Sequence, residues 1–408
     1  MSIPMDFGPI LATLRRHRTA AALIVLEIAL SCAFVCNAIY LIGGRVSRME
    51  HPSGLAESEL VRVQITAPGK QEDAQVAIQE DLALLSAIPG VRKAAFTRQL
   101  PFGNSSWNSG VKLTLEETHS RLVATTYLGS EGLLETLGVQ LVAGRDFTRD
   151  EYVDEEEALA STTTGPIIIT RAVAERLWPG QPGVGQTLYL GGHTLQVIGV
   201  LERLVRPNEY HGAADYELSL LVPVRERYTR TVNYVLRVDP ARRAEVLAAA
   251  SSALGQSRPG RIILEKQTLE EMRNKYYRGD RAMAWLLVSV CAALLIVTAL
   301  GIVGLASFWV GQRTRQIGIR RALGATRGQV VRYFQAENFL LATFGIALGM
   351  LLAYGINQLL MERYELGRLP AQYLPVGALS LWMLGQLAVL GPALRAASVP
   401  PAVATRTV

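Results

Sequence analysis

Four stretches of the chain are almost wholly apolar and are separated by polar segments. They cover residues 19–44, 282–310, 337–361 and 375–394, and a charged residue, Glu27, lies in the middle of the first. A helix of about 20 apolar residues crosses the hydrocarbon layer of a membrane, so we predict a transmembrane helix over each range. The second stretch would be about 43 Å long as a helix, which is more than a bilayer needs. Its surplus is expected to tilt or to form a stalk.

The first and fourth stretches each have an alternative interpretation. Basic residues precede the first stretch, as they do in a cleaved signal peptide. We favour a retained helix, because the stretch is longer than a signal-peptide core and no small-residue cleavage site follows it. For the fourth, the alternative is a buried helix of a soluble domain. Neither alternative fits the spacing of the whole set.

Arginines flank the predicted membrane helices unevenly. Arg15, Arg16 and Arg18 come just before the first helix, and six arginines lie in the segment 313–332, which has no acidic residue. Arginine-rich connections of membrane proteins stay in the cytoplasm. We therefore assign residues 1–18, 311–336 and 395–408 to the cytoplasm and residues 45–281 to the outer side of the membrane.

The segment from 45 to 281 has the pattern of a folded domain. Residues 58–98 predict a strand, a helix and a strand, and residues 231–268 repeat that order. Residues 100–230 contain short strands and turns, with Gly191 and Gly192 placed to form a hairpin. The predicted fold class is an α-helical membrane protein with four transmembrane helices plus a large α+β domain, built from two βαβ halves with an inserted β-rich module.

Composition and charge narrow the function classes. Hydrophobic residues make up 50% of the chain and charged residues 19%, which excludes a disordered protein. The 41 Lys and Arg against 35 Asp and Glu give a net charge of +6. The arginines gather beside the membrane helices, so this excess indicates topology and contact with lipid headgroups, not a nucleic-acid surface. Each of the three cysteines lies in an apolar stretch, which argues against a disulfide framework.

The sequence contains no pattern typical of a catalytic site. The five histidines are widely spaced, and HExxH, GxSxG and GxxxxGK[ST] patterns are absent. Acidic residues cluster at 146–157, but they lack the spacing and the glycine of an EF-hand, so we favour a solvated loop over a cation site. We expect that the chain is not an enzyme and has no catalytic residue, metal site or cofactor of its own.

The segment 313–338, RTRQIGIRRALGATRGQVVRYFQAEN, predicts two helices joined by a tight corner. Gly324 is placed to end the first helix, and Thr326 with Gln329 has the spacing of a capping box that opens the second. One interpretation is a basic loop that only fixes the topology. The other is an element that presents an arginine-rich helical corner to a cytoplasmic partner.

The predicted membrane helices also contain one charged residue and several glycines that suggest where the helices contact one another. Glu27 is an intramembrane carboxylate, which is costly and often functional. It lies about three turns from the first arginine cluster, so we expect it to pair there or to turn toward a dimer interface, with a transport role as the alternative. Gly301, Gly304 and Ala306 in the second helix, and Gly345 and Gly349 in the third, suit close helix packing, and a lipid-facing position without a packing role is the alternative.

These segments resemble a known family. RTRQIGIRRALGATRGQVVRYFQAENFLL (313–341) and PALRAASVPPAVATR (392–406) resemble the FtsX-like permease domain. YLGSEGLLETLGVQLVAGRDFTRDE (127–151) and the stretch 166–201 resemble the periplasmic core domain of MacB-type transporters. The ATPase domain that MacB carries in the same chain has no counterpart in these 408 residues. The resemblance is therefore to the stand-alone permease whose ATPase is a separate protein.

The resemblance implies a permease subunit of a mechanotransmission, or type VII, ABC transporter in the bacterial inner membrane. A separate cytoplasmic ATPase subunit would bind ATP and Mg²⁺ and drive efflux of a peptide, antibiotic or lipid-linked substrate. Further implied partners are a second permease, in a homodimer or heterodimer, a periplasmic membrane-fusion adaptor and an outer-membrane channel. The residues expected to couple to the ATPase are Arg320, Arg321, Leu323, Ala325 and Arg327, while Gly318 and Gly324 serve close approach and helix termination.

Other functions stay open at this point. An FtsX-like signalling permease would activate a cell-wall hydrolase and transport nothing. A Lol-like permease would release lipoproteins from the membrane. A membrane enzyme is the alternative with the least support, because no nucleophile, base and metal grouping is present.

Overall fold

The computed structural model describes residues 18–66, 74–160, 163–209, 215–225, 231–364 and 368–398. The chain divides into two compact units. The helical unit comprises residues up to 49 and from 279 onward, and the sheet domain comprises residues 50–278. Each unit is described by itself below. The arginines at positions 15, 16 and 406 and the histidines at 17 and 211 lie outside the described residues.

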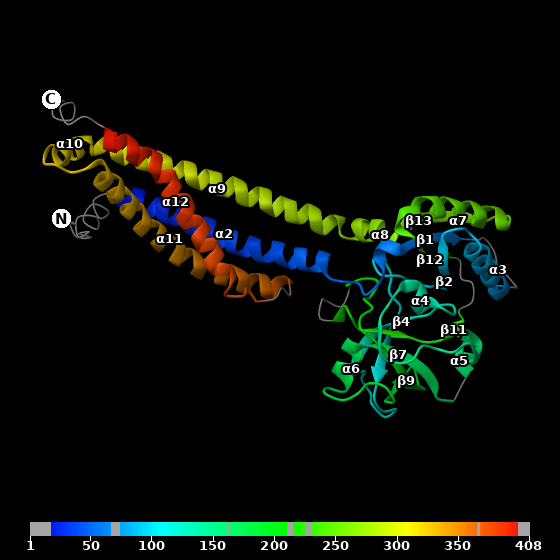
Figure 1. The fold of residues 1–408 in the computed structure, drawn as a ribbon. Coiled ribbons are helices and arrows are strands. Elements are labelled where there is room, and N and C mark those ends of the chain that lie inside the picture. The colour runs from blue at the N-terminus through cyan, green and yellow to red at the C-terminus, as the bar shows by residue number, and fades with distance from the viewer. Residues whose placement is uncertain are drawn as a thin grey trace. The chain divides into compact units, whose positions relative to one another are not determined.

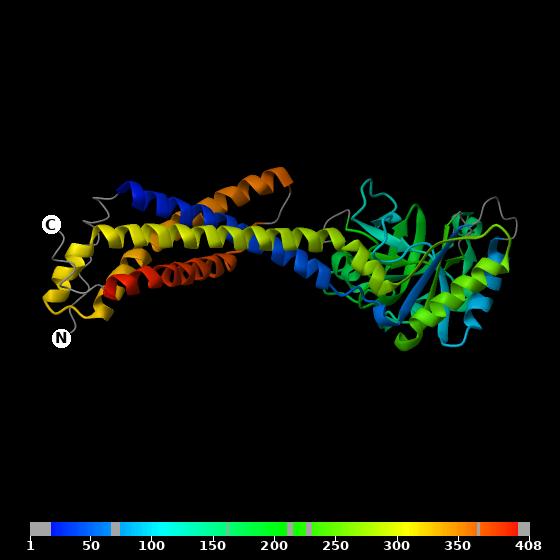
Figure 2. The ribbon, with the colours of Figure 1, turned by 90° about the horizontal axis from the view of Figure 1, so that it is seen from above.

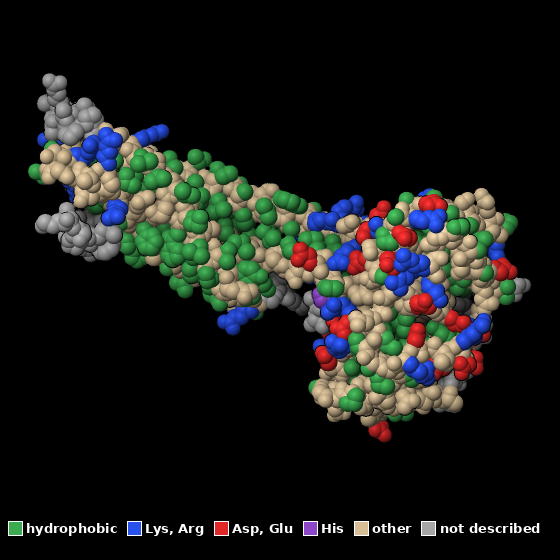
Figure 3. Space-filling model, viewed as in Figure 1, with side chains coloured by type: hydrophobic (Ala, Val, Ile, Leu, Met, Phe, Trp, Pro, Cys, Tyr) green, Lys and Arg blue, Asp and Glu red, His purple; other side chains and the backbone are tan. Residues whose placement is uncertain are grey.

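Long apolar helices make up the helical unit (Figures 1 and 2). In the part of the chain that the structure describes, four helices are long and apolar enough to cross a membrane. The helices of this unit are α2 (Arg18–Glu50), α9 (Arg278–Gln312), α10 (Thr314–Ala322), α11 (Arg327–Tyr364) and α12 (Tyr373–Ser398). On the face seen in Figure 3, hydrophobic side chains are spread along the length of this unit and charged ones gather toward its ends, as expected for a lipid-facing bundle.

The helices continue beyond the apolar stretches from which they were predicted. The membrane helix expected over 337–361 and the helix expected to open after Thr326 are one helix, α11, which begins at Arg327. Likewise α2 runs six residues past position 44. Apolar length marks the part of a helix that fits the hydrocarbon layer, whereas the helical hydrogen bonds continue until a capping residue stops them.

Glycines allow α11 to lie close against α2. A Cβ added at Gly345 would be 2.8 Å from Cβ of Ile28, and one added at Gly349 would be 2.5 Å from Cβ of Cys32. The packing role predicted for these two glycines is therefore confirmed. For Gly304 the alternative of a position without a packing role holds, because a Cβ there would meet no atom within 4 Å. Gly304 lies on the exposed side of α9, where no described helix covers it.

Polar side chains also join the helices. The hydroxyl groups of Ser31 in α2 and Thr298 in α9 are 2.7 Å apart, and both residues are buried. The amide of Asn37 donates to the carbonyl oxygen of Ala353 in α11 at 3.1 Å. Buried polar groups need hydrogen-bond partners where no water is present, and here they find them on the neighbouring helix. These two hydrogen bonds therefore fix the register of α2 against α9 and α11.

One sheet of the domain has four strands in the order β13-β1-β12-β2, and every neighbouring pair is antiparallel. β1 lies between β12 and β13, and β12 lies between β1 and β2, so the two segments predicted as separate halves interleave in one sheet. Helices α3 and α7 bury Ile78, Val246 and Leu254 against this sheet. The bounds are β1 (Leu60–Thr66), α3 (Ala74–Ser86), β2 (Val91–Thr97), β12 (Thr231–Val238), α7 (Arg243–Ser257), β13 (Ile262–Thr268) and α8 (Leu269–Tyr276).

The second sheet has seven strands in the order β5-β9-β7-β10-β4-β3-β8, and β8 also pairs with β9. Its strands are β3 (Asn108–Lys112), β4 (Leu122–Tyr127), β5 (Leu141–Gly144), β7 (Gly165–Thr170), β8 (Thr187–Leu190), β9 (His193–Leu201) and β10 (Ser219–Leu221). β6 (Val153–Asp154) pairs with β11 (Val224–Arg225). The short helices are α4 (Leu133–Leu137), α5 (Glu155–Ala160) and α6 (Arg171–Leu177).

The hairpin predicted at Gly191 and Gly192 is present. Leu190 of β8 pairs with His193 of β9 across a two-residue turn. Both glycines have positive φ, +56° and +92°, which is the backbone that a type I′ turn needs and that other residues adopt only with strain.

Candidate functional site

The corner between α10 and α11 is defined by its hydrogen bonds. After α10 ends, the N–H of Gly324 donates to the carbonyl oxygen of Arg321 at 3.1 Å, and the N–H of Ala325 donates to that of Arg320 at 3.0 Å. Gly324 has a φ of +98°. This pattern is a Schellman motif, which ends a helix at a glycine in the left-handed region. Helix termination at Gly324, predicted from the sequence, is therefore confirmed.

A capping box starts α11 two residues later. The backbone N–H of Thr326 donates to Oε1 of Gln329 at 2.9 Å, and the backbone N–H of Gln329 donates to Oγ1 of Thr326 at 3.3 Å. The spacing of these two residues in the sequence predicted this pair. The free backbone N–H groups at the corner bond to carbonyl oxygens at the end of α10 and to side-chain oxygens at the start of α11, so the corner holds its shape through local bonds.

One side of α10 is buried and the other is exposed. Ile317 and Gly318 are buried, and Ile317 joins the apolar core of the helical unit beside Val330 and Phe334 of α11. Leu323 is 83% exposed, although it is among the most apolar of side chains. The tip of the turn therefore presents an apolar side chain that no described residue covers.

Three arginines lie within four residues of Leu323 in the sequence. Arg320 and Arg327 are exposed, and Arg321 is partly buried. The guanidinium of Arg320 lies 5.0 Å from the centre of the Tyr333 ring in α11, a cation–π distance. Of the residues predicted for coupling, the structure thus places Arg320, Leu323 and Arg327 at the surface, Ala325 at half-burial and Gly318 inside the unit. Their role in coupling stays a prediction.

A buried ion pair fixes the corner to the long helices. Nη1 of Arg313, which lies between α9 and α10, is 2.9 Å from Oε2 and 3.2 Å from Oε1 of Glu337 in α11. The Glu337 side chain is 2% exposed and that of Arg313 is 10% exposed. From the sequence, Arg313 was one of several basic residues of the connection, and Glu337 was not predicted to be its partner. The available signal was a lone acidic residue at the start of an apolar stretch, which in a membrane helix implies a buried partner.

Glu27 lies against α9. A Cβ added at Gly301 would be 2.6 Å from Oε2 of Glu27, so Gly301 provides the space that the carboxylate occupies. Within the described residues Glu27 makes no ion pair. The pairing expected with the N-terminal arginines is therefore not seen for Arg18, and Arg15 and Arg16 are outside the described residues.

The acidic loop has internal partners. Glu151 accepts from Arg145 through both of its oxygens, at 2.6 and 2.8 Å, and Gln75 donates to Asp154 at 2.7 Å. Hydrogen bonding from the Arg145 guanidinium lowers the pKa of Glu151 to about 2. Among the described residues, no group of three His, Cys, Asp or Glu side chains is arranged to hold a metal ion.

Two family models match residues 21–254 and 288–401 of the chain. The model of the MacB-like periplasmic core domain matches residues 21–254, which is more than half of the chain. The model of the FtsX-like permease C-terminal domain matches residues 288–401, which include the corner and the ion pair. The chain belongs to the MacB/FtsX-like family of ABC transporter permeases. It is accordingly a membrane protein with a periplasmic domain.

Curated relatives are similar over much of the permease. The macrolide export ATP-binding/permease protein MacB of Chromobacterium violaceum is 26% identical over 65% of this chain and 40% of its own length. The MacB of Acinetobacter baylyi is 23% identical over 98% of this chain and 59% of its own length. The ABC transporter permease YknZ of Bacillus subtilis, named as uncharacterized, is 24% identical over 68% of this chain and 65% of its own length. The chain thus spans less than two thirds of each of these relatives.

Proposed function

We propose that this permease transmits conformational work from a separate cytoplasmic ATPase subunit to its periplasmic domain and so drives export. The observation that carries the proposal is the exposed Leu323, presented with Arg320 and Arg327 on a corner that a buried ion pair ties to α9 and α11. Such a surface offers apolar contact area and positive charge to a partner while it keeps a fixed shape.

The ion pair supports the transmission step. A displacement of α10 acts on Arg313, and Arg313 is held by Glu337, so the start of α11 has to follow. α9 is one continuous helix from Arg278 to Gln312, and α8 of the sheet domain ends two residues before it begins. A continuous helix conveys a shift at one end to the other, because its hydrogen-bonded turns resist compression.

ATP can change the conformation of the permease only if the ATPase binds the two permease conformations with different affinity. The ATPase has to contact the corner more favourably in one nucleotide state than in the other, since a partner that binds two conformations equally shifts neither. A difference of about 3 kcal/mol in contact free energy would change the ratio of the two conformations by roughly 100-fold.

The substrate class is inferred from relatives. Two similar proteins are named for the export of macrolides and of pyoverdine. We infer export of a peptide, antibiotic or lipid-linked substrate from the periplasmic side of the inner membrane, in an assembly with a second permease, a membrane-fusion adaptor and an outer-membrane channel. ATP and Mg²⁺ would be bound by the ATPase subunit.

Site-directed crosslinking tests the proposal. The native cysteines Cys32, Cys36 and Cys291 would be replaced by alanine, and a single cysteine would be introduced as Leu323→Cys or, as the control, Leu115→Cys in the sheet domain, whose side chain is 60% exposed. We expect the cysteine at 323 to crosslink to the co-expressed ATPase with a yield that differs between the nucleotide-free and ATP-bound states. Labelling of position 323 by a membrane-impermeant thiol reagent from outside intact spheroplasts would refute the proposal.

A further inference from the structure

The edge strand β13 of the four-stranded sheet has an unpaired outer side. β13 stands at the end of the order β13-β1-β12-β2, and no described strand pairs with its outer edge. A free edge presents a row of backbone N–H and C=O groups that another strand can join, and natural proteins usually protect it.

The opposite edge of the same sheet provides the comparison. β2 carries Arg92 and Lys93 in its exposed part, where Lys93 forms an ion pair with Glu135 at 2.9 Å. The end of β2 is closed by a bridge between Thr97 and Gly129. Charged side chains and a covering segment are the usual means of blocking an edge. β2 is therefore protected.

β13 also carries two charged residues, Glu265 and Lys266, but within the described residues it has no such bridge along its outer edge. Its exposed side chains include Ile262, 56% exposed, and Leu264, 47% exposed. The one acidic residue of the strand, Glu265, is engaged by Arg62 and by Lys275, whose Nζ lies 2.8 Å from Oε1 of Glu265. Ile262 lies opposite Thr66, on the same face as Glu265, so these aliphatic side chains leave the edge itself open for an added strand.

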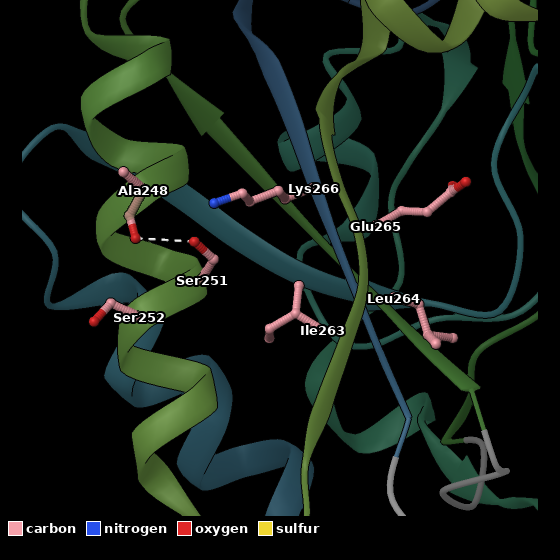
Figure 4. A pocket seen from close by; sticks show the side chains of 7 residues that line it. All are labelled: Ala248, Ser251, Ser252, Ile263, Leu264, Glu265 and Lys266. Carbon is pink, nitrogen blue, oxygen red and sulfur yellow. Dashed lines mark hydrogen bonds between the residues drawn. The ribbon is translucent and has the colours of Figure 1, made fainter.

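An open cavity of about 500 Å³ runs beside this edge, between β13 and α7 (Figure 4). The α7 side is lined by small residues, Ala248, Ser251 and Ser252, and the β13 side by Ile263 through Lys266. In Figure 4 the Lys266 side chain extends toward α7, while Glu265 points the other way. A free strand edge next to a helix with small side chains is the geometry of grooves that bind an extended peptide as an added strand.

Strand register explains which side chains face the cavity. Residues that lie opposite each other in an antiparallel pair share a face of the sheet. Lys266 lies opposite Val63, and Ile263 lies opposite Ile65, and both of these β1 residues are buried beneath the helices. Lys266 and Ile263 are therefore on the α7 side. Glu265 lies opposite Gln64 on the other side.

We propose that this groove, defined as β13 with Ala248, Ser251 and Ser252 of α7, binds an extended segment of a partner protein with an acidic residue opposite Lys266. Within the described residues the Lys266 ammonium has no carboxylate partner, so the groove carries an uncompensated positive charge. Backbone hydrogen bonds along β13 would supply affinity, and the acidic residue would supply selectivity.

A second copy of this chain fits the groove less well. Paired through its own β13, it would bring Ile263, Lys266 and Thr268 to the α7 face, and none of these is acidic. Lys266 would then meet an apolar residue, a hydroxyl or another ammonium. Charge complementarity thus favours a different polypeptide, and the proposal is independent of the ATP-coupling function above.

Defined peptides test the groove on the full-length protein in detergent. The probes are two nine-residue peptides of alternating valine and threonine, one with a central glutamate and one with a central lysine. We expect the glutamate peptide to slow amide hydrogen exchange at residues 262–266. It should also bind about tenfold more tightly than the lysine peptide, because its glutamate attracts Lys266 whereas the lysine of the other peptide repels it. Lys266→Glu should reverse that preference.

Matched variants on α7 give the control. Ala248→Trp fills the cavity and is expected to weaken the glutamate peptide at least tenfold, whereas Ala249→Trp, at an exposed neighbour that does not line the cavity, should leave binding unchanged. Three results would overturn the proposal. They are equal binding of the glutamate peptide by the two tryptophan variants, slowed hydrogen exchange outside β13 on adding the peptide, and a preference for the glutamate peptide that survives Lys266→Glu. Protection of β13 that rises with protein concentration without peptide would also overturn it, since a second copy would then be the occupant.

Discussion

The carboxylate of Glu337 in α11 lies 2.9 Å from Nη1 of Arg313 at the end of α9, and both side chains are buried. This pair joins the two long helices at the point where the α10 corner leaves them. A buried ion pair contributes little net stability, but the loss of one partner leaves an uncompensated charge. We infer that the main effect of the Arg313–Glu337 pair is to fix the position of the corner relative to α9 and α11.

Glu337→Ala should therefore destabilise the helical unit by about 3 kcal/mol, because Arg313 keeps its charge without a partner. Thermal unfolding in detergent measures the change. The double variant Arg313→Met/Glu337→Met, which removes both charges, should regain most of that stability. A single variant as stable as the wild type would show that the pair does not organise the corner.

Leu323→Asp is expected to weaken co-purification with the ATPase at least tenfold while leaving the melting temperature within about 1 °C, since an 83% exposed side chain contributes little to folding. Pull-down and ATPase turnover measure the first effect and thermal unfolding the second. Leu115→Asp, a similarly exposed leucine in the sheet domain, is the matched control and should change neither. An unchanged yield for Leu323→Asp would argue against this contact.

Gly349→Ala should destabilise the packing of α11 on α2. The new Cβ would lie 2.5 Å from Cβ of Cys32 and 2.7 Å from the carbonyl oxygen of Ala29, and the backbone there cannot move aside without shifting α2. We expect a loss of about 1–3 kcal/mol in thermal unfolding experiments. Gly304→Ala, where a Cβ meets nothing within 4 Å, is the control and should be neutral or slightly stabilising.

The acid stability of the sheet domain should depend in part on Glu151. Its pKa of about 2, lowered by the Arg145 guanidinium, is below the ordinary value of about 4.3 for glutamate. A lowered pKa contributes stability that is present above pH 4.3 and is lost as the pH falls toward 2. The stability difference between wild type and Glu151→Gln should accordingly be largest near neutral pH and shrink from pH 5 to pH 2. Melting temperatures of the two proteins measured from pH 7 to pH 2 check this. A difference in melting temperature that stays constant over that range would show that the Arg145–Glu151 pair does not contribute to the pH dependence.

Local patterns predicted much of the corner. Gly324 and the Thr326–Gln329 pair act on backbone groups within four residues of themselves, so their spacing in the sequence is sufficient to place a helix end and a helix start. The same reasoning holds for Gly191 and Gly192, whose turn requires positive φ at both positions. The apolar stretches likewise identified the helices, although the helix ends lie outside them.

Contacts between distant residues could not be predicted in this way. Arg313 and Glu337 are 24 residues apart, and only the reversal of direction at the corner brings them together. Lys266 was one of many exposed lysines and arginines until strand order placed it on the α7 side of a free edge. The sequence by itself determined the membrane helices, the turns and the arginine-rich corner, because these follow from local hydrogen bonding and from the length of apolar segments. Tertiary structure decided which charges are paired and which edge is open, because those depend on the packing of segments that the sequence order keeps apart.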